Sequence, residues 1–338
     1  MGGSDTAGSR AVSGWKRWIP VGRVLLSVGM LAILVRQVRV RSLVPVWDVS
    51  TIGLLAGGVA LATFGIVLSA YRWQRVLAAM ELPARLGPLL NAYLASQFIS
   101  NFLPSTIGGD ALRVTRLSAF SRDETGTNGA PAAFASVVLD RMSGWLILPL
   151  LCLAGLLINP SLRHLGRSSR AALAISTVTL AALVAVVIAA GSTKLGGRLA
   201  GHDSWLRFLG AVHLGLARIA RRPAAAAQVI VASVVYQLAI IGAGILAARA
   251  IGIRVGPTAL LAFIPAVAIV QVLPLTVGGL GVREGAFALF LQPLGVPAGQ
   301  AIALGLAMYA MHLIASLLGA PSFAVGHRPA RGPHVPAA

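Results

Sequence analysis

The chain has 338 residues, of which 57% are hydrophobic and only 11% are charged, and its mean hydropathy is +0.84. Soluble domains carry about a quarter charged residues, so this composition excludes an ordinary soluble enzyme or binding domain. The net charge is +19, and the basic residues flank apolar stretches. Contact with anionic lipid headgroups explains that charge better than contact with nucleic acid, so the sequence predicts a polytopic membrane protein.

The apolar stretches are long and continuous rather than alternating, which favours transmembrane helices over a β-barrel. Each clear stretch is near the ~20 residues that a helix needs to cross the hydrocarbon core. Six full spans are predicted, over 19–35, 52–70, 132–158, 171–190, 223–248 and 298–323.

One transmembrane domain is predicted over 19–325, between a disordered cytoplasmic N-terminus, 1–18, and a disordered cytoplasmic tail, 326–338. The first apolar run is followed by arginines rather than by a small-residue cleavage site. This favours a retained first span over a signal peptide. Two amphipathic segments are predicted at the membrane interface: an aromatic and basic anchor over 71–75, and an interfacial helix over 205–222.

Two further apolar regions, 86–118 and 257–292, are interrupted by Pro and Gly-Gly and do not resemble single helices. The interruptions are copies of one motif: Leu103–Arg113 recurs as Leu273–Arg283, and six of the eleven positions are identical. Matching breaks in two halves of a membrane protein are typical of paired broken helices around a central site. Each region is therefore predicted to form a helical hairpin.

Three full spans separate the two motifs, and an odd number inverts the second copy relative to the first. The predicted fold is thus an all-α transmembrane bundle with an inverted-topology repeat, its halves covering about 52–158 and 223–323, and two broken, re-entrant hairpins. The most basic loop, 194–222, is placed in the cytoplasm. The first hairpin then opens to the cytoplasm and the second to the outside. Irregular backbone at that depth must face protein or water, so both motifs are expected to line a cavity near the midplane.

Ionisable residues in the apolar regions are few. A charged side chain at the bilayer centre costs about 2.5–3.5 kcal/mol even on insertion scales, so each one needs a partner, a function or both. One interpretation is a substrate site, and the other is a set of ion pairs that holds the two halves together. His312 is expected to be a packed polar residue hydrogen-bonded to another helix. The remaining ionisable candidates are Asp110, Arg113, Asp140, Arg141, Arg283 and Glu284.

The glycine pairs of the two motifs permit tight reversal and leave backbone N–H groups free to meet an anion. Arg113 and Arg283 occupy the same motif position, and a guanidinium suits a phosphate fork. The hypothesis is that the two arginines hold a lipid phosphate in turn. Glu284 would pair with a cationic headgroup or keep Arg283 in place.

Soluble catalytic and cofactor motifs are absent from the sequence. There is no Cys/His metal spacing, no phosphate-binding Gly-x-x-x-x-Gly-Lys and no Gly-x-Ser-x-Gly elbow. No cofactor, metal or bound ATP is predicted. The single cysteine, Cys152, is expected to be a small buried apolar residue.

The segments Asn101–Pro104, Gly108–Asp110, Asp140–Arg141 and Pro274–Glu284 resemble the transmembrane region of lysylphosphatidylglycerol synthases, a flippase-like family. The resemblance covers roughly 20–325. It implies a multi-pass protein of the cell's inner or plasma membrane that moves a modified phospholipid between leaflets. The full-length synthases carry a soluble aminoacyl-transfer domain after this region, which this sequence does not show, so synthase activity is not expected.

The predicted function is translocation of an anionic or aminoacylated phospholipid, or of a lipid-linked headgroup. Two alternatives stay open: a membrane-embedded enzyme or subunit acting on isoprenoid-linked sugars or phospholipids, and a membrane anchor for a separate synthase or transferase. As an enzyme, it would use Asp110, Asp140 and Glu284 for acid–base chemistry. The candidate substrate-binding residues are Asn101, Pro104, Gly108, Gly109, Asp110, Arg113, Asp140, Arg141, Pro274, Gly278, Gly279, Arg283 and Glu284.

Overall fold

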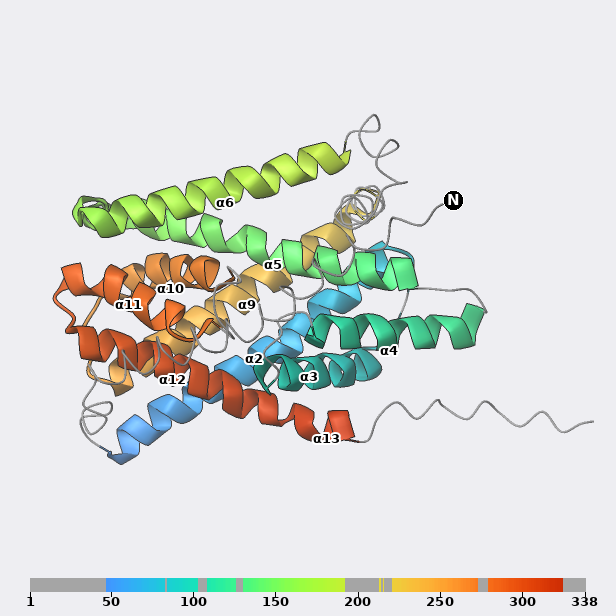
Figure 1. Cartoon of the computed structure of the whole chain (residues 1–338), viewed down its shortest axis with the longest axis horizontal. Helices are drawn as coiled ribbons and strands as arrows, with labels where there is room; N and C mark the ends of the chain where they lie inside the picture. The colour runs from blue at the N-terminus through green and yellow to red at the C-terminus, as the bar shows by residue number, and fades with distance from the viewer. Residues whose placement is uncertain are drawn as a thin grey trace, which may run out of the picture.

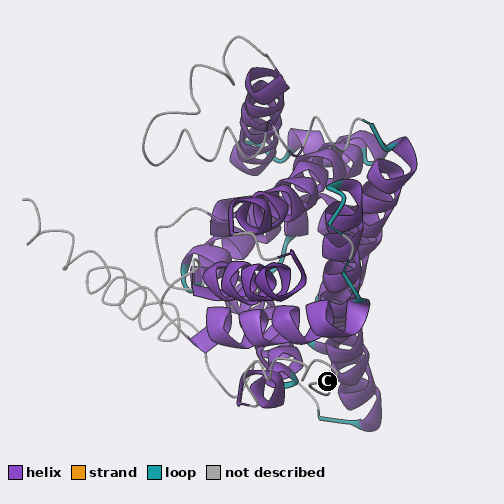
Figure 2. Cartoon of the chain, turned by 90° about the vertical axis from the view of Figure 1, so that its right-hand side faces the viewer, coloured by secondary structure: helices purple, strands orange, loops and turns teal. Residues whose placement is uncertain are grey.

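The computed structural model describes residues 47–82, 84–102, 108–125, 130–191, 213, 215, 221–272 and 279–324. Within these residues the chain is helical, without strands (Figure 2). The helices are α2 (Val49–Ala79), α3 (Leu86–Phe102), α4 (Gly108–Thr125), α5 (Ala130–Ile158), η2 (Pro160–His164), α6 (Arg167–Gly191), α9 (Pro223–Ala250), α10 (Pro257–Val272), α11 (Val282–Leu291), η4 (Gln292–Leu294), α12 (Ala298–Leu317) and α13 (Gly319–Ala324).

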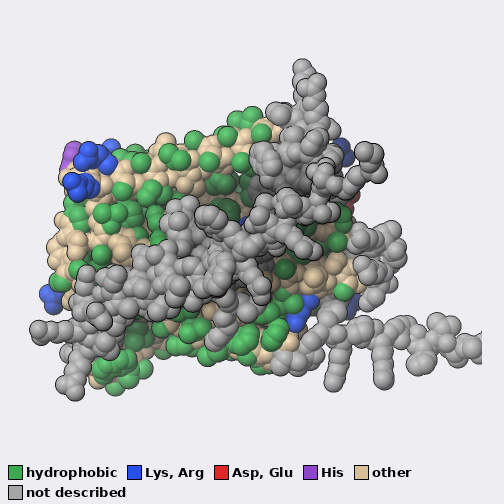
Figure 3. All heavy atoms as spheres, viewed as in Figure 1, with side chains coloured by type: hydrophobic (Ala, Val, Ile, Leu, Met, Phe, Trp, Pro, Cys, Tyr) green, Lys and Arg blue, Asp and Glu red, His purple; other side chains and the backbone are tan. Residues whose placement is uncertain are grey.

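Five of these helices, α2, α5, α6, α9 and α12, are long and apolar enough to cross a membrane. The all-α, polytopic fold predicted from composition is therefore confirmed. Apolar side chains cover much of the described surface between the two ends of the molecule, and the visible Lys and Arg side chains lie mostly toward those ends (Figure 3). This is the distribution that a lipid-embedded bundle requires.

Helix boundaries follow local chemistry. The Asp48 carboxylate accepts a hydrogen bond from the Thr51 N–H at 2.7 Å and caps α2, and this bond lowers the pKa of Asp48. Pro223 begins α9, where its missing N–H costs nothing. Gly281, at φ +85°, precedes α11 in a conformation that favours glycine.

Each broken region forms two helices, as predicted: 86–118 contains α3 and most of α4, and 257–292 contains α10 and α11. Three spans agree within a few residues. The span predicted over 52–70 is wrong at its C-terminal end, because α2 continues to Ala79. The span predicted over 298–323 is divided into α12 and α13. The first span 19–35, both predicted termini and most of the amphipathic segment 205–222 lie outside the described residues.

The helices pack in corresponding pairs. Helix α2 packs on α3, α5 and α12, while α9 packs on α10, α12 and α5. Helix α5 also packs on α10, as α12 does on α3, and α2 and α9 pack on each other. Suppose that α2, α3, α4 and α5 trade places, in that order, with α9, α10, α11 and α12. Every contact named above then becomes a contact that is also present in the structure. In Figure 1 the α3–α4 pair lies toward one end of the long axis and the α10–α11 pair toward the other.

The orientation can be tested at two exposed positions. A Cβ atom added to Gly87, at the start of α3, would meet no other atom within 4 Å, and Ser161 is exposed after α5. In a Cys152→Ala background, Ser161→Cys should react with a membrane-impermeant thiol reagent in intact cells, and Gly87→Cys should react only after lysis. Labelling of Gly87→Cys, but not of Ser161→Cys, in intact cells would reverse the predicted orientation.

Candidate functional site

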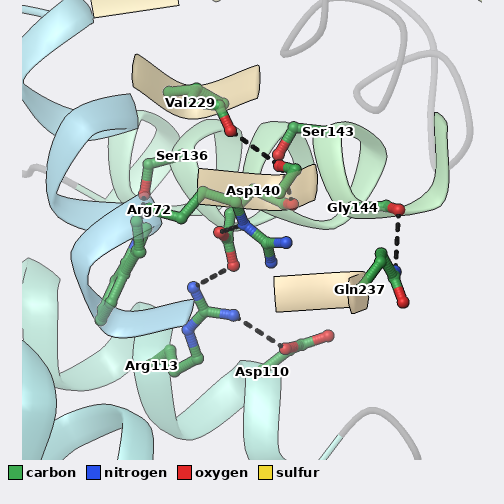
Figure 4. A network of polar contacts seen from close by, with 11 residues as sticks. Arg72, Asp110, Arg113, Ser136, Asp140, Ser143, Gly144, Val229 and Gln237 are labelled. Carbon is green, nitrogen blue, oxygen red and sulfur yellow. Dashed lines mark hydrogen bonds and ion pairs between the residues drawn. The ribbon is translucent and has the colours of Figure 1, made fainter. Parts of the chain in front are cut away.

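A buried carboxylate joins three helices of the first half. Asp140, in the first half of α5, is fully buried. Its Oδ1 accepts a hydrogen bond from Arg72 Nε of α2 at 2.7 Å, and its Oδ2 accepts one from Arg113 Nη2 of α4 at 2.7 Å (Figure 4). These are short, charge-assisted bonds. Both carboxylate oxygens are therefore engaged inside the protein.

Two aromatic rings hold the Arg113 guanidinium in place. Its Cζ atom lies 4.2 Å from the Trp73 ring centroid and 4.6 Å from that of Tyr93. Trp73, itself fully buried, donates its indole N–H to Ser136 Oγ on α5 at 3.1 Å. A cation between desolvated aromatic faces is stabilised by the ring quadrupoles. The first hairpin is thus fixed to both α2 and α5 through one side chain.

One side of this charged group, formed by Asp110 and Arg141, is more exposed to the surroundings, and we call it the open edge. Asp110, in the first turn of α4, forms ion pairs with Arg113 at 3.7 Å and with Arg141 at 2.6 Å. The side chains of Asp110 and Arg141 are 22% and 38% exposed, against 3% for Arg113. Two adjacent residues of α5 therefore pair with different partners. Asp140 pairs with Arg72 and Arg113, and Arg141 pairs with Asp110.

The group has more positive than negative charge. Arg72, Arg113 and Arg141 face two carboxylates, Asp110 and Asp140, so the described ion pairs leave one guanidinium charge without compensation. Arg72 Nη1 is also buried without a hydrogen-bond partner among the described residues. A buried cation of this kind needs an anion or water, so the site suits an anionic ligand. We call Arg72, Asp110, Arg113, Asp140 and Arg141 the charge cluster.

The absence of a side chain at Gly144 of α5 lets the Arg72 guanidinium pack against the α5 backbone. A Cβ atom at this position would lie 2.7 Å from Arg72 Nη1. The Gly144 carbonyl accepts a hydrogen bond from Gln237 Nε2 of α9 at 3.2 Å (Figure 4). The second half of the chain therefore reaches the cluster through α9.

The second motif holds its charges differently. Glu284 is fully buried: its Oε1 accepts bonds from Arg283 Nη2 at 2.7 Å and Nε at 3.0 Å, and its Oε2 accepts the Gly281 N–H at 2.6 Å. The Arg283 guanidinium also lies over the Tyr309 ring, at 4.8 Å. This group is neutral and closed on itself. Within the described residues, no hydrogen bond or ion pair links it to the charge cluster.

The motif glycines fit where a side chain would not. At Gly109 a Cβ atom would lie 2.6 Å from the Ser96 carbonyl oxygen of α3, so the two limbs of the first hairpin touch there. Gly279 has φ +71°, and a Cβ atom there would collide with the side chain of Gln271. Gly108 begins α4, and Asn101 lies partly buried near the end of α3. Pro104, Pro274 and Gly278 lie outside the described residues.

Part of the site carries no recognisable sequence signal. The segment 71–75 has the pattern of an interface anchor, but Arg72 and Trp73 are 5% and 0% exposed, which makes that prediction wrong for these two residues. No sequence pattern marks Tyr93 or Tyr236. His312 Nδ1 lies 3.0 Å from the Met308 carbonyl of its own helix, rather than bonding to another helix as expected.

An apolar cavity of about 150 Å³ lies between α2, α5, α6 and α9, lined by residues that include Val76, Leu139, Leu183 and Ile230. It contains no motif residue, so the predicted midplane cavity is not this one. In the part of the chain that the structure describes, no cluster of three or more His, Cys, Asp or Glu residues could hold a metal ion.

A comparison with known protein families assigns the chain to one family. The Lysylphosphatidylglycerol synthase TM region matches residues 21–319. The chain belongs to this family. No match was found among curated proteins or among solved structures. As a member of the lysylphosphatidylglycerol synthase transmembrane-region family, the chain is a multi-pass membrane protein related to lipid handling.

The central carboxylate gives this family member a clear stability test. Asp140→Asn should lower the free energy of unfolding by about 3–5 kcal/mol, because Arg72 and Arg113 would stay buried without their carboxylate. The thermal unfolding midpoint in detergent measures the loss. Glu81→Gln is the control: Glu81 forms an exposed pair with Arg222, so its loss should cost under about 1 kcal/mol. Equal midpoints for Asp140→Asn and wild type would contradict the assigned role.

Proposed function

We propose that the protein translocates an anionic or aminoacylated phospholipid between the leaflets of the cell's inner or plasma membrane. The observation that carries the proposal is the charge cluster: three arginines and two aspartates beside the broken helix pair α3–α4, of which Arg72, Arg113 and Asp140 are buried. Uncompensated charge in a membrane segment is expensive and is typical of substrate paths. The family relation to lipid handling supports the same function.

The proposal includes an inverted repeat. Two observations support it: the contacts of α2 to α5 correspond one by one to those of α9 to α12, and three membrane-crossing helices, α5, α6 and α9, lie between the two motifs. The hairpins lie toward opposite ends of the long helices (Figure 1). Hairpins that enter from opposite faces are a common basis for alternating access in transporters.

Within this proposal Arg113 and Arg141 have different roles. Arg113 is 2% exposed and bound to Asp140, so it positions the cluster rather than meeting the headgroup first. Arg141, at the open edge, is the residue through which the headgroup arrives. Glu284 is saturated by Arg283 and Gly281, which favours the structural role considered for it over contact with a cationic headgroup.

The enzymatic alternative is less well supported. A general base must have an oxygen free to take a proton from the substrate. Both oxygens of Asp140 and of Glu284 already accept hydrogen bonds from the protein. Only Asp110, of the three acidic candidates, is partly exposed.

Transport should depend on the open edge of the cluster. In proteoliposomes with matched protein amounts, Arg141→Gln should slow phosphatidylglycerol flipping by roughly tenfold or more, because a desolvated phosphate loses a charged partner. Arg141→Lys should restore only part of the rate, since an ammonium group forms no bidentate fork.

The matched control is Arg222→Gln, which removes an exposed arginine paired with Glu81. It should flip at the wild-type rate. An unchanged rate in Arg141→Gln would remove the headgroup role, and no flipping by the wild-type protein would overturn the proposed function.

A further inference from the structure

Two tyrosines from opposite halves of the chain border the charge cluster. Tyr93 belongs to α3 and lies over the Arg113 guanidinium, with 4.6 Å between Cζ and the ring centroid. Tyr236 belongs to α9, and Arg72 Cζ lies 5.6 Å from its ring centroid. The two rings therefore lie against two guanidinium groups that share the Asp140 carboxylate, and Arg141 follows Asp140 on α5.

Several hydrogen-bond donors of these side chains have no acceptor within the described residues. Arg72 Nη1 is buried, on a side chain only 6% exposed, and has no hydrogen-bond partner among the described residues. Arg141, which is paired with Asp110, presents the most exposed guanidinium of the charge cluster, on a side chain that is 38% exposed. Neither tyrosine hydroxyl hydrogen-bonds to another residue in the part of the chain that the structure describes.

We propose that Arg72, Tyr93, Arg141 and Tyr236 form the binding site for one lipid phosphate, at the contact between the two halves. The inference rests on the proposed function and specifies its ligand contacts. A phosphate offers several strong acceptor oxygens, and guanidinium and phenol groups are donors that match them. Arg72 and Arg141 are also paired with Asp140 and Asp110, and the excess of three arginines over two aspartates leaves net positive charge for the phosphate.

A phosphate bound at this site would contact helices from both halves of the chain. Arg72, Tyr93 and Arg141 come from α2, α3 and α5, and Tyr236 comes from α9, which begins the second set of helices. α2 and α9 pack closely here: a Cβ atom at Gly65 of α2 would lie 3.3 Å from the Tyr236 ring. A phosphate held by all four side chains stabilises the arrangement in which α9 lies against the first half. Its departure releases that restraint.

The chain contains four tyrosines, which provides a complete matched set of variants. Tyr93→Phe and Tyr236→Phe remove only a hydroxyl and keep the rings that face Arg113 and Arg72. Tyr71→Phe and Tyr309→Phe are the controls: these rings lie near Arg75 and Arg283, outside the cluster. The measurement is the binding of phosphatidic acid, and of diacylglycerol with the same chains, to purified protein in phosphatidylcholine nanodiscs.

We expect Tyr93→Phe and Tyr236→Phe each to weaken phosphatidic acid binding by about tenfold, the loss of one hydrogen bond to a charged group. Tyr71→Phe and Tyr309→Phe should bind like wild type, and diacylglycerol binding should be weak and equal in all five proteins. Equal phosphatidic acid binding by all four variants would overturn the inference. Complete displacement of the lipid by inorganic phosphate at equal concentration would also overturn it, by showing a site for a soluble anion.

Failure of this inference can be distinguished from failure of the proposed function. If wild-type protein flips phosphatidylglycerol but the tyrosine variants bind normally, only the phosphate contacts are wrong. If the tyrosine variants bind weakly but wild-type protein does not flip lipid, the site is real and the transport function is wrong.

Discussion

The buried carboxylate of Asp140 is the interaction on which the first half of the molecule depends. Its two oxygens receive Arg72 from α2 and Arg113 from α4, each at 2.7 Å, so three helices meet at one anion. In hydrocarbon neither arginine could remain charged and unpaired without a cost of several kcal/mol. The two aromatic rings next to Arg113, the indole bond to Ser136 and the close approach of Gly144 to Arg72 surround these cations.

Each half of the chain buries an arginine from its motif, Arg113 or Arg283, but the two arginines are neutralised in different ways. The second half closes its arginine with a neighbouring carboxylate, Glu284, which also accepts the Gly281 N–H at the start of α11. That group is neutral, and the Arg283 guanidinium also lies over the Tyr309 ring of α12, at 4.8 Å. The first half spreads five ionised groups over α2, α4 and α5 and keeps one cation in excess. A similar arrangement of helices therefore carries one neutral ion pair and one group with an excess of positive charge.

Much of this arrangement could be predicted from the sequence. The Pro and Gly-Gly breaks indicate the two hairpins, because helices cannot continue through such segments. The high cost of membrane-embedded charge marks Asp110, Arg113, Asp140 and Arg141, and these four residues do contact one another. Arg72 could not be recognised, because a basic residue among aromatics at the end of an apolar run is also the pattern of an interface anchor. Only the extension of α2 to Ala79 places it inside. Tyr236 contacts the cluster through helix packing, which no local pattern encodes.

The central claim is that the charge cluster carries one positive charge that an anionic lipid neutralises. A ligand that binds the folded state raises the unfolding midpoint to an extent set by its affinity and concentration. The direct measurement is therefore the thermal unfolding midpoint in phosphatidylcholine nanodiscs, with and without phosphatidylglycerol, for wild type and for Arg141→Leu. The account predicts that phosphatidylglycerol raises the midpoint of the wild type and leaves that of Arg141→Leu unchanged. An equal rise in both proteins would contradict it.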